Sequence, residues 1–370
     1  MKKLLPEVCT IQYGFPFDSA KFSDSDGMPL IRIRDVVRGY SETYTTEEYK
    51  SEYIVHENDL LIGMDGEFNI AKWGKTPALL NQRVCRLAPE DSIDKDYLFY
   101  FMPVALKRIE EKTPFVTVKH LSAKELNKIE IPVLPLKEQR KIAETLSKVD
   151  ELIAFRDQQL AKLDELVKAR FVEMFGDINV NNKKWMTYPL GELCTIVRGG
   201  SPRPIEKYLG GTIPWIKIGD ATTGENIYLN STKECIIQEG VKKSRMIKAG
   251  SLIFANCGVS LGFARIITFD GCIHDGWLAM EDIDEKLDKI FLLYSLNQMT
   301  EYFRKTAPAG TQPNLNTNIM KMHRQIVPPM EMQKAFISFV RYIDNQKQLV
   351  QQGLEKLELM KKALMQEYFG

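Results

Sequence analysis

Hydrophobic positions along the chain follow two patterns, which occur in the same order twice. The first pattern is a series of short apolar runs that alternate with polar residues, as is typical of β-strands. These runs are centred on Ile31, Leu61, Val84, Ile216, Ile253 and Ile266. Apolar residues then recur at helical spacing over residues 96–109 and 288–303, so each set of strands is followed by a predicted helix.

The second pattern is a long helical stretch that closes each half of the chain. Helices are predicted over about 139–175 and 333–369, just after Pro135 and Pro329, because proline is tolerated at a helix entry. Apolar residues repeat every seven positions in both, which is typical of coiled coils. The repeating positions, which we also expect to serve in docking other subunits, are Leu146, Val149, Ile153, Leu160, Leu163, Val167, Val340, Ile343, Val350, Leu354, Leu357 and Leu364.

Charged residues interrupt the heptads at Arg156 and Arg170 in the first helix and at Lys347 and Lys361 in the second. We expect the helices to pack as a coiled coil; the alternative is two amphipathic helices, each packed on its own domain. Because the first helix leads from one globular part to the other and the second ends the chain, paired helices must run antiparallel. At ~1.5 Å per residue, each helix would form a rod of ~55 Å.

The chain is an internal repeat, because residues of one half match those of the other at a nearly constant separation. The separation is 185 residues for Gly14 and Gly199, and 194 residues for Pro135 and Pro329. The second copy gains the difference in the middle of its globular part, where insertions in loops are tolerated. Such a repeat predicts an approximate two-fold axis across the coil.

The predicted fold class is therefore α+β, with two mixed α/β domains separated by two long helices packed as an antiparallel coiled coil. The expected boundaries are residues 1–135 for the first domain, 136–176 for the first helix, 177–328 for the second domain and 329–370 for the second helix.

Composition narrows the class of protein. The chain has 370 residues and a net charge of +1, which excludes a polycationic binder but not a locally basic one. The first predicted domain has a net charge of −3 and the second of +3. No apolar run is long enough to cross a membrane, and six scattered cysteines without a C-x-x-C pair favour the cytoplasm. Cys272 and His274 are the nearest approach to a metal cluster, and a buried thiol beside an ordinary histidine is the favoured interpretation.

Motifs for catalysis by this chain are incomplete. Gly74-Lys75-Thr76 resembles the end of a phosphate-binding loop, but Asn69 stands where its first glycine belongs. A basic loop around Trp73 that touches DNA is the favoured interpretation. The tetrapeptide with which adenine methyltransferases grip their base and the Pro-Asp dipeptide of one nuclease type are both absent from the sequence.

Several stretches resemble the specificity (S) subunit of type I restriction-modification systems, over essentially the whole chain. Lys119-His120-Leu121-Ser122 and Pro135-Leu136-Lys137-Glu138-Gln139 are similar to that family's junction between a target-recognition domain and a spacer helix. Leu190-Gly191-Glu192 is similar to the entry into its second recognition domain. The second junction departs from this motif, with Met332 in place of Glu138.

The resemblance implies a non-catalytic, DNA-binding subunit of a cytoplasmic complex. Each recognition domain would read one half of an asymmetric, bipartite site in double-stranded DNA, and the helices would set the gap and dock two methyltransferase (M) subunits. No cofactor is expected on this chain: S-adenosylmethionine would belong to the M subunit, which methylates adenine at N6, and ATP and Mg²⁺ to a possible restriction (R) subunit. The alternative is a DNA-binding adaptor of the same architecture with no methylase partner.

Candidate DNA-binding residues are polar side chains in the loops, since arginine reads guanine and asparagine reads adenine. Those in the first domain are Arg32, Arg34, Arg38, Lys72, Lys75 and Lys119. Those in the second are Arg198, Arg203, Lys217, Lys242, Lys243, Arg245, Asn256 and Asn314. Trp215, Trp277 and Tyr294 are expected in the core.

Overall fold

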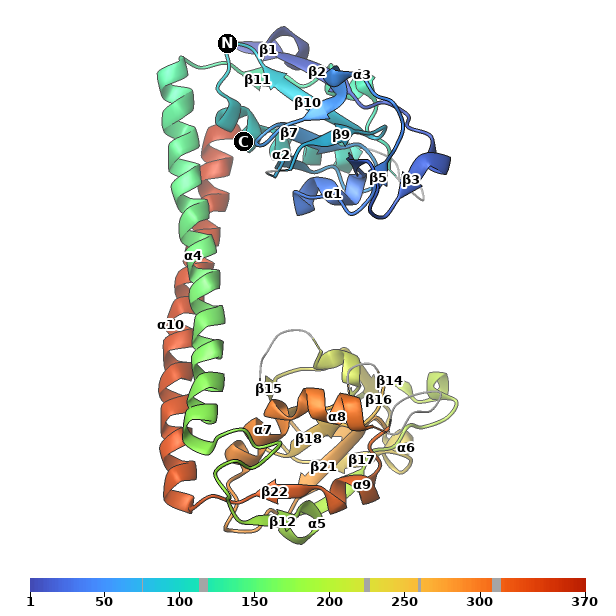
Figure 1. Ribbon diagram of the computed structural model, residues 1–370, viewed down its shortest axis with the longest axis vertical. Helices are drawn as coiled ribbons and strands as arrows, with labels where there is room; N and C mark the ends of the chain where they lie inside the picture. The colour runs from blue at the N-terminus through green and yellow to red at the C-terminus, as the bar shows by residue number, and fades with distance from the viewer. Residues whose placement is uncertain (75, 113–118, 223–226, 259–260, 308–313) are drawn as a thin grey trace. The chain divides into compact units, whose positions relative to one another are not determined.

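The computed structural model describes residues 1–74, 76–112, 119–222, 227–258, 261–307 and 314–370. These residues form two compact units, one made of Met1–Arg156 with Gln352–Gly370 and the other of Asp157–Gln351. Each unit contains one globular part and a stretch of both long helices, α4 (Leu136–Phe175) and α10 (Met330–Phe369) (Figure 1). We refer to them as unit 1 and unit 2.

The globular part of unit 1 contains a four-stranded antiparallel sheet, β2-β10-β7-β8, and a second sheet, β3-β5-β4-β9-β6. Its strands are β1 (Lys2–Leu4), β2 (Cys9–Tyr13), β3 (Phe22–Ser23), β4 (Met28–Ile31), β5 (Tyr44–Thr45), β6 (Ile54–Val55), β7 (Leu60–Gly63), β8 (Ile70–Lys72), β9 (Ala78–Leu80), β10 (Val84–Pro89) and β11 (Glu130–Pro132). Its helices are η1 (Leu5–Glu7), η2 (Ser19–Lys21), α1 (Ile33–Arg38), η3 (Ser51–Tyr53), α2 (Lys95–Lys112) and α3 (Ala123–Leu126).

The globular part of unit 2 has the sheets β13-β21-β18-β19-β15 and β16-β14-β20-β17. Its strands are β12 (Thr187–Pro189), β13 (Thr195–Arg198), β14 (Leu209–Ile216), β15 (Tyr228–Leu229), β16 (Glu234–Ile236), β17 (Arg245–Ile247), β18 (Leu252–Ala255), β19 (Ala264–Ile267), β20 (Gly271–Ile273), β21 (Trp277–Glu281) and β22 (Arg324–Ile326). Its helices are α5 (Leu190–Leu193), η4 (Ile205–Lys207), η5 (Ile218–Asp220), α6 (Gln238–Val241), α7 (Lys289–Gln298), α8 (Thr300–Thr306) and α9 (Thr317–Met322).

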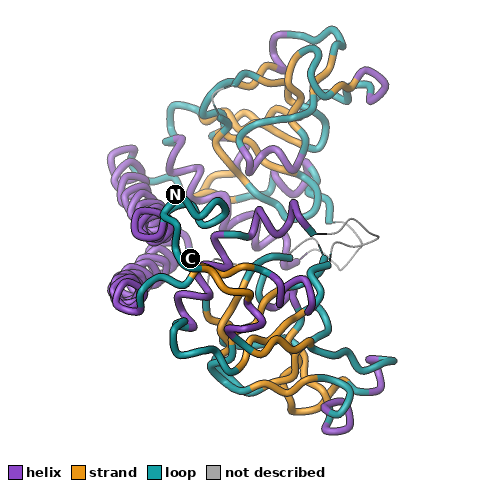
Figure 2. Tube along the Cα trace, turned by 60° about the horizontal axis from the view of Figure 1, so that its bottom comes forward, coloured by secondary structure: helices purple, strands orange, loops and turns teal. Residues whose placement is uncertain are grey.

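The two globular parts repeat the same topology. The antiparallel order β2-β10-β7-β8 corresponds to β13-β21-β18-β19, and the parallel pair β4/β9 corresponds to β14/β20. Gly14 and Gly199 occupy the same tight crossing, since a Cβ on Gly14 would lie 1.9 Å from the Asn81 carbonyl oxygen and one on Gly199 2.2 Å from that of His274. Figure 2 shows the strands of each part in orange, with the helices in purple.

Each central strand is buried on both faces. Leu60 and Ile62 of β7 face the core that includes α2, whereas Leu61 faces the core against the second sheet. In β18, Leu252 and Ile253 divide between two cores in the same way. A run that is apolar at every position forms a strand of this kind, because both faces of the strand are buried.

Each apolar run predicted as a strand has its central residue in one, and the helix over 96–109 is confirmed as part of α2. The helix predicted over 288–303 is wrong in one respect, because the structure divides it at Met299 into α7 and α8. Thr300 Oγ1 donates to the carbonyl oxygens of Asn297 at 2.9 Å and Gly262 at 2.7 Å. This side chain competes with the backbone at the break.

The long helices begin three residues earlier than predicted, directly after Pro135 and Pro329. The Pro135 carbonyl accepts hydrogen bonds from the N–H groups of Glu138 and Gln139, at 2.8 and 3.1 Å. The Pro329 carbonyl likewise accepts from the backbone at positions 332 and 333. Proline therefore closes the first turn as an acceptor, without needing an N–H group of its own.

Among the described residues, no helix is long and apolar enough to span a membrane.

A fully buried glutamine joins each long helix to its globular part. Gln139 Nε2 donates to the carbonyl oxygens of Ser92 (3.0 Å) and Leu134 (2.7 Å), and its Oε1 accepts from the Asp94 N–H at 2.8 Å. This side chain therefore ties the helix to the turn before α2. We call this arrangement the glutamine joint.

Unit 2 contains the same joint. Gln333 Nε2 donates to the carbonyl oxygens of Lys286 (2.9 Å) and Pro328 (2.8 Å), and its Oε1 accepts from the Asp288 N–H at 2.8 Å. Gln333 is also fully buried. Both copies thus fix the first turn of their helix with the same set of three hydrogen bonds.

Replacing the joint residue in unit 1 should destabilise that unit. Gln139→Leu keeps the volume but leaves two carbonyl oxygens and one N–H buried without partners, which should cost about 2–5 kcal/mol of unfolding free energy. Urea unfolding measures the loss, and hydrogen exchange at the Asp94 amide should speed up locally. Gln158→Leu, on an exposed position of α4, is the matched control. Equal stability of the two variants would show that the joint is not needed.

Candidate nucleic-acid interface

Basic residues of unit 2 gather around the turn that joins β20 to β21. Arg198, the last residue of β13, donates from Nε to the carbonyl oxygen of Asp275 at 2.9 Å. Arg245, the first residue of β17, donates from Nε to the carbonyl oxygen of Arg198 at 3.2 Å. Both side chains are exposed, so backbone contacts hold the two guanidinium groups at the surface.

His274 and Asp275 lie at the centre of this cluster. His274 Nε2 lies 3.0 Å from Asp275 Oδ1, which also accepts from Ser201 Oγ at 2.6 Å. Burial lowers the pKa of His274, Asp275 opposes the effect, and the charges of Arg203 and Lys217 lower it further. Lys217 Nζ lies 5.8 Å from the centre of the Trp215 ring, whose centre lies 5.5 Å from that of the His274 ring. We define the basic patch of unit 2 as Arg198, Arg203, Lys217 and Arg245.

The carboxylate of Asp275 remains ionised beside the patch. Burial alone would raise its pKa, but the hydrogen bond from Ser201 and the neighbouring His274, Arg198 and Arg203 outweigh burial and lower the pKa. The site thus combines an anionic centre with a surrounding excess of positive charge. The surrounding positive charges of such a surface can bind the phosphate backbone of DNA, while its central polar groups face the bases.

Lys217, Lys242 and Lys243 differ in their partners. Lys217 forms an ion pair with Glu234, and Lys243 Nζ donates to the hydroxyl of Tyr208 at 2.6 Å. Lys242 is exposed at the end of α6. Lys217 and Lys243 therefore have partners within the chain that a phosphate would have to share.

Asn256 and Asn314 are brought together, although 58 residues separate them. Asn256 Nδ2 donates to Asn314 Oδ1 at 3.1 Å. Asn256 is fully buried at the end of β18, whereas Asn314 is half-buried. The prediction that Asn256 contacts DNA is therefore wrong for this structure; its side chain supports Asn314 instead.

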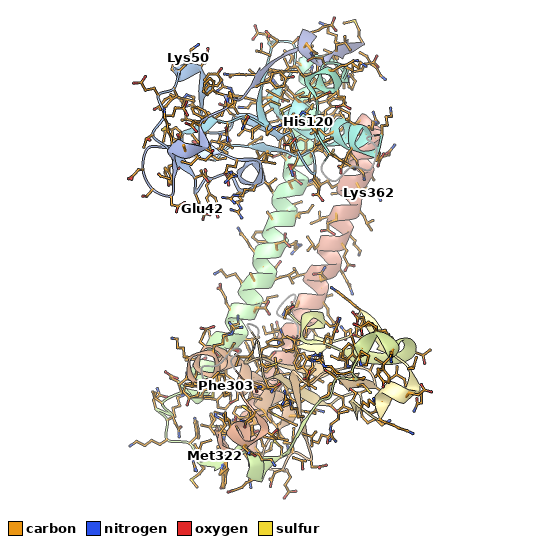
Figure 3. The ribbon with its side chains drawn as sticks, turned by 90° about the vertical axis from the view of Figure 1, so that its right-hand side faces the viewer. Glu42, Lys50, His120, Phe303, Met322 and Lys362 are labelled. Atoms are coloured by element: carbon orange, nitrogen blue, oxygen red, sulfur yellow. The ribbon has the colours of Figure 1, made fainter. Side chains whose placement is uncertain are left out.

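Unit 1 has a different polar cluster at the equivalent place, which the sequence interpretation missed. His120 Nδ1 lies 2.5 Å from Asp65 Oδ1, and Arg83 Nε lies 3.7 Å from Asp65 Oδ2. His120, labelled in Figure 3, is 47% exposed. The 194-residue separation between His120 and Asn314 was the available signal, since it equals that of the two joint glutamines.

Three of the arginines nominated in unit 1 lie on or beside α1. Arg32 precedes the helix and is exposed. Arg34 lies 3.7 Å from Asp35, and Arg38 lies 3.7 Å from Glu42. The Arg38–Glu42 pair is exposed on both sides and therefore weak, whereas Asp35 is buried and only the Arg34 side of its pair faces solvent. All three guanidinium groups thus remain at the surface.

The lysines nominated in unit 1 are more strongly held. Lys72 Nζ lies 2.8 Å from Asp96 Oδ1, and Lys119 Nζ lies 3.2 Å from Glu110 Oε1. Lys75 lies outside the described residues. Unit 1 therefore shows a less concentrated positive surface than unit 2, in line with its lower net charge.

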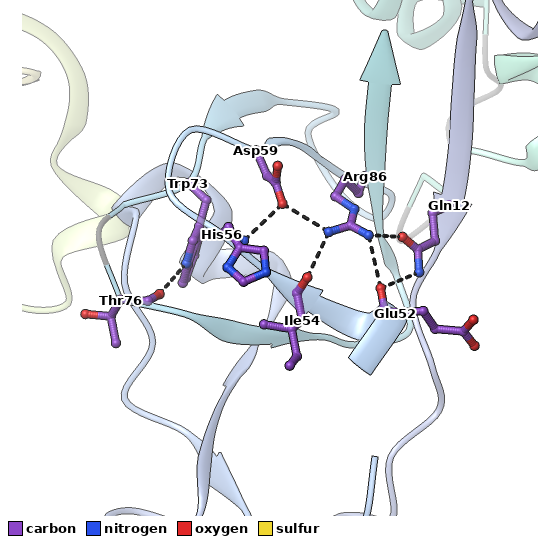
Figure 4. A network of polar contacts seen from close by, with 8 residues as sticks. All are labelled: Gln12, Glu52, Ile54, His56, Asp59, Trp73, Thr76 and Arg86. Atoms are coloured by element: carbon purple, nitrogen blue, oxygen red, sulfur yellow. Dashed lines mark hydrogen bonds and ion pairs between the residues drawn. The ribbon is translucent and has the colours of Figure 1, made fainter. Parts of the chain in front are cut away.

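Other polar residues of unit 1 are structural. Arg86 donates to Asp59 Oδ2 at 3.0 Å and to the carbonyl oxygens of Ile54 and Glu52 at 2.8 and 3.0 Å (Figure 4). Trp73 is only 2% exposed, and its Nε1 donates to the Thr76 carbonyl at 2.7 Å. The sequence predicts that the basic loop around Trp73 touches DNA. Because the indole is buried and its donor is already paired, Trp73 itself supports this loop from the inside.

The metal-site alternative at Cys272 and His274 can be compared with the structure. Cys272 is fully buried, and burial raises the pKa of its thiol. No group of three potential metal ligands occurs among the described residues. Trp215 and Trp277 are buried and Tyr294 packs partly buried against the core, as predicted.

Removing one charge from the basic patch should weaken DNA binding and its salt dependence. Arg203→Gln should reduce the slope of log affinity against log salt by about 1, because one fewer counterion is released. Titrations of the full chain in its complex, at several salt concentrations, measure this slope. The matched control is Lys248→Gln, whose exposed ammonium pairs with Asp270 at 2.8 Å. Identical slopes for the two variants would remove Arg203 from the interface.

Comparison with protein families gives a match over most of the chain. A sequence model of the type I restriction modification DNA specificity domain matches residues 1–165 and 182–359. The two matched stretches follow the two copies of the internal repeat.

Individual relatives agree with this match. The specificity subunit of the type I restriction enzyme EcoBI from Escherichia coli is 43% identical over 164 residues, which cover 44% of this chain and 34% of that subunit. The MjaVIII specificity subunit from Methanocaldococcus jannaschii is 24% identical over 382 residues, which cover 91% of this chain and 87% of that subunit. The chain thus spans about a third of the first relative's length and most of the second's.

Solved structures share the fold. The S subunit of a type I restriction-modification system from M. genitalium matches all of this chain and 96% of its own, with a TM-score of 0.54 at 16% identity. A chain from work on complex assembly and conformational transition of the type I R-M system matches all of this chain and 97% of its own, with a TM-score of 0.64 at 17% identity.

Proposed function

This chain belongs to the type I restriction-modification DNA specificity family, and from that premise we propose that each unit reads one half of a bipartite duplex DNA site. One observation carries the proposal: both globular parts build the same surface position from the same topology but line it with different side chains. His120 stands there in unit 1 and Asn314 in unit 2. Different side chains at the same position of a repeated fold would recognise different bases, as an asymmetric DNA site requires.

An antiparallel coil of α4 and α10 is the proposed spacer. Within unit 1, Lys361 Nζ lies 2.5 Å from Asp150 Oδ1, and within unit 2, Lys347 pairs with Asp164. Moving 14 residues forward on α4 therefore corresponds to moving 14 residues back on α10, as antiparallel pairing requires. The lysines that interrupt the heptads thus have carboxylate partners on the facing helix, which supports one register.

Burial along the helices also supports the coil. Leu146 and Val149 of α4 are at most 4% exposed, and Val340 and Ile343 of α10 at most 2%. The other heptad positions, Ile153, Leu160, Leu163, Val167, Val350, Leu354, Leu357 and Leu364, are buried or half-buried. The heptad seam therefore lies inside each unit rather than on its surface, so these positions do not fit the docking of other subunits that the sequence analysis also expects of them.

Exposed apolar residues on the helices support docking of partner subunits. Leu152 and Phe155 of α4 are 47% and 59% exposed, and Tyr342 and Leu349 of α10 are 60% and 62% exposed. Soluble surfaces rarely leave such side chains in rows along a helix without a partner. We assign these positions to two methyltransferase subunits, which would bring S-adenosylmethionine; a restriction subunit would bring ATP and Mg²⁺. In this proposal catalysis lies with those partners and not with this chain.

The comparisons do not favour the alternative, an adaptor with no methylase partner, since the matched relatives are named specificity subunits of type I restriction enzymes. DNA recognition within such a complex is the function that the family and the fold support together.

The complex of this chain with its modification subunit should methylate DNA at one bipartite, asymmetric sequence. Exchanging residues 1–135 for the recognition domain of another specificity subunit should change one half of that sequence and leave the other half and the gap unchanged. Sequencing of methylated DNA measures both. Absence of any bipartite motif, or a change in both halves, would contradict the proposal.

Shortening both helices together should shorten the gap. The facing segments 154–160 and 351–357 follow the register of the two ion pairs, so deleting both removes one heptad and about 10 Å of rod, or about three base pairs. We expect a shorter gap in the methylated motif, or loss of binding where DNA cannot follow the rotation.

Deleting 154–160 alone is the matched control, because it removes the same length from one helix but breaks the ion-pair register. The single deletion should destabilise the protein more than the double deletion. A double-deletion protein that binds DNA with its gap unaltered would exclude the spacer role.

A further inference from the structure

We propose that His120 and Asn314 are the equivalent specificity-determining residues of the two half-sites, with Asp65 and Asn256 as their positioning residues. This inference rests on the proposed function and deepens it, because it names which side chain in each unit meets a base edge. It is carried by backbone equivalence, by burial and by the different support that each side chain receives.

The two residues occupy the same backbone position in their copies. His120 forms an isolated β-bridge with Asp65, and Asn314 forms one with Cys257. The residue that follows each of them is a buried leucine, whose N–H donates to the backbone carbonyl of Met64 in unit 1 and of Asn256 in unit 2, both at 2.7 Å. Because successive side chains of extended backbone point to opposite sides, a buried leucine turns its neighbour outward.

A third backbone contact completes the equivalence. The Met64 N–H donates to the Arg83 carbonyl at 2.9 Å, and the Asn256 N–H donates to the Gly276 carbonyl at 3.0 Å. The chain path around the site is thus the same in both units, and the side chains alone differ. We call the site the recognition corner: Asp65, Arg83 and His120 in unit 1, and Asn256, Cys257 and Asn314 in unit 2.

Side-chain support in unit 2 points to a reading role for Asn314. A polar group that is fully buried costs free energy unless its hydrogen bonds are made, and Asn256 makes one through Nδ2 to Asn314 while its Oδ1 has no partner among the described residues. Unit 1 has the apolar Met64 at that position. Stability alone therefore does not explain Asn256, whereas orienting the amide of Asn314 does.

The chemistry of the Asn314 amide then predicts its target. With Oδ1 accepting from Asn256, the Nδ2 group of Asn314 remains to donate, and Oδ1 keeps a second lone pair. An amide with one donor and one acceptor directed outward matches the N7 and N6 edge of adenine in the major groove.

His120 presents different groups. Its Nδ1 lies 2.5 Å from Asp65 Oδ1 and 3.3 Å from Arg83 Nη1, so Nε2 is the ring atom that remains to meet a base edge. Arg83 lies beside it, with its Nε 3.7 Å from Asp65, and provides a donor fork suited to guanine. The two corners therefore have different preferences on one scaffold.

The test uses the full chain in complex with its modification subunit and reads the methylated motif by sequencing. Asn314→Ala should relax base preference in the half-site of unit 2 only, and His120→Ala in that of unit 1 only. Discrimination at the affected base pair should fall roughly 5- to 160-fold, the equivalent of about 1–3 kcal/mol. Asn256→Leu should relax the same position as Asn314→Ala, as expected of a positioning residue.

Controls keep the outcomes distinct. His56→Ala and Asn179→Ala change exposed residues of the same types outside the corners and should leave the motif unaltered. Where an alanine variant unfolds, His120→Gln and Asn314→Gln retain polarity and should change the preferred base instead.

An unaltered motif in folded corner variants would overturn the inference, and so would a uniform loss of methylation with the base preference intact. Either result leaves the proposed function standing. A complex of the unmodified chain that yields no bipartite motif would instead overturn the proposed function.

Discussion

In each unit a fully buried glutamine ties the first turn of a long helix to the globular part. A recognition domain attached to a long helix can bind DNA at a fixed position only if the attachment is rigid. Each glutamine joint makes three hydrogen bonds inside the core, which hold the attachment in place. Leaving any of those backbone groups unpaired would cost more than the net value of the bond. Gln139 and Gln333 therefore fix the direction of α4 and α10 against their globular parts.

The two copies share their backbone contacts and differ in the side chains at their surfaces. Backbone contacts around the joint, the tight glycine crossing and the recognition corner are equivalent in both units. Side chains at the corner differ, as do the surrounding charges: arginines cluster around His274 and Asp275 in unit 2, whereas the nominated lysines of unit 1 that the structure describes pair with nearby carboxylates. One scaffold can thus present two unrelated surfaces without altering its core.

Much of the fold followed from the sequence because its signals are local or periodic. Strands around Leu61 and Ile253 were predicted from apolar runs, and both long helices from spacing, although proline closed their first turns earlier than predicted. Positions that depend on tertiary contacts were not predictable in this way. Whether a polar residue such as Asn256 faces solvent is decided by the neighbouring strands, and the partners of Lys347 and Lys361 lie about two hundred residues away along the chain.

Base-modification interference on bound DNA shows whether one chain reads two separated DNA segments at a fixed distance. DNA modified at random is bound by the full complex, and the bases whose modification prevents binding are mapped. We expect two clusters of such bases with different sequences, separated by a stretch of constant length in which modification has no effect. A single continuous cluster, or two clusters at variable separation, would show that the chain does not read two segments at a fixed distance.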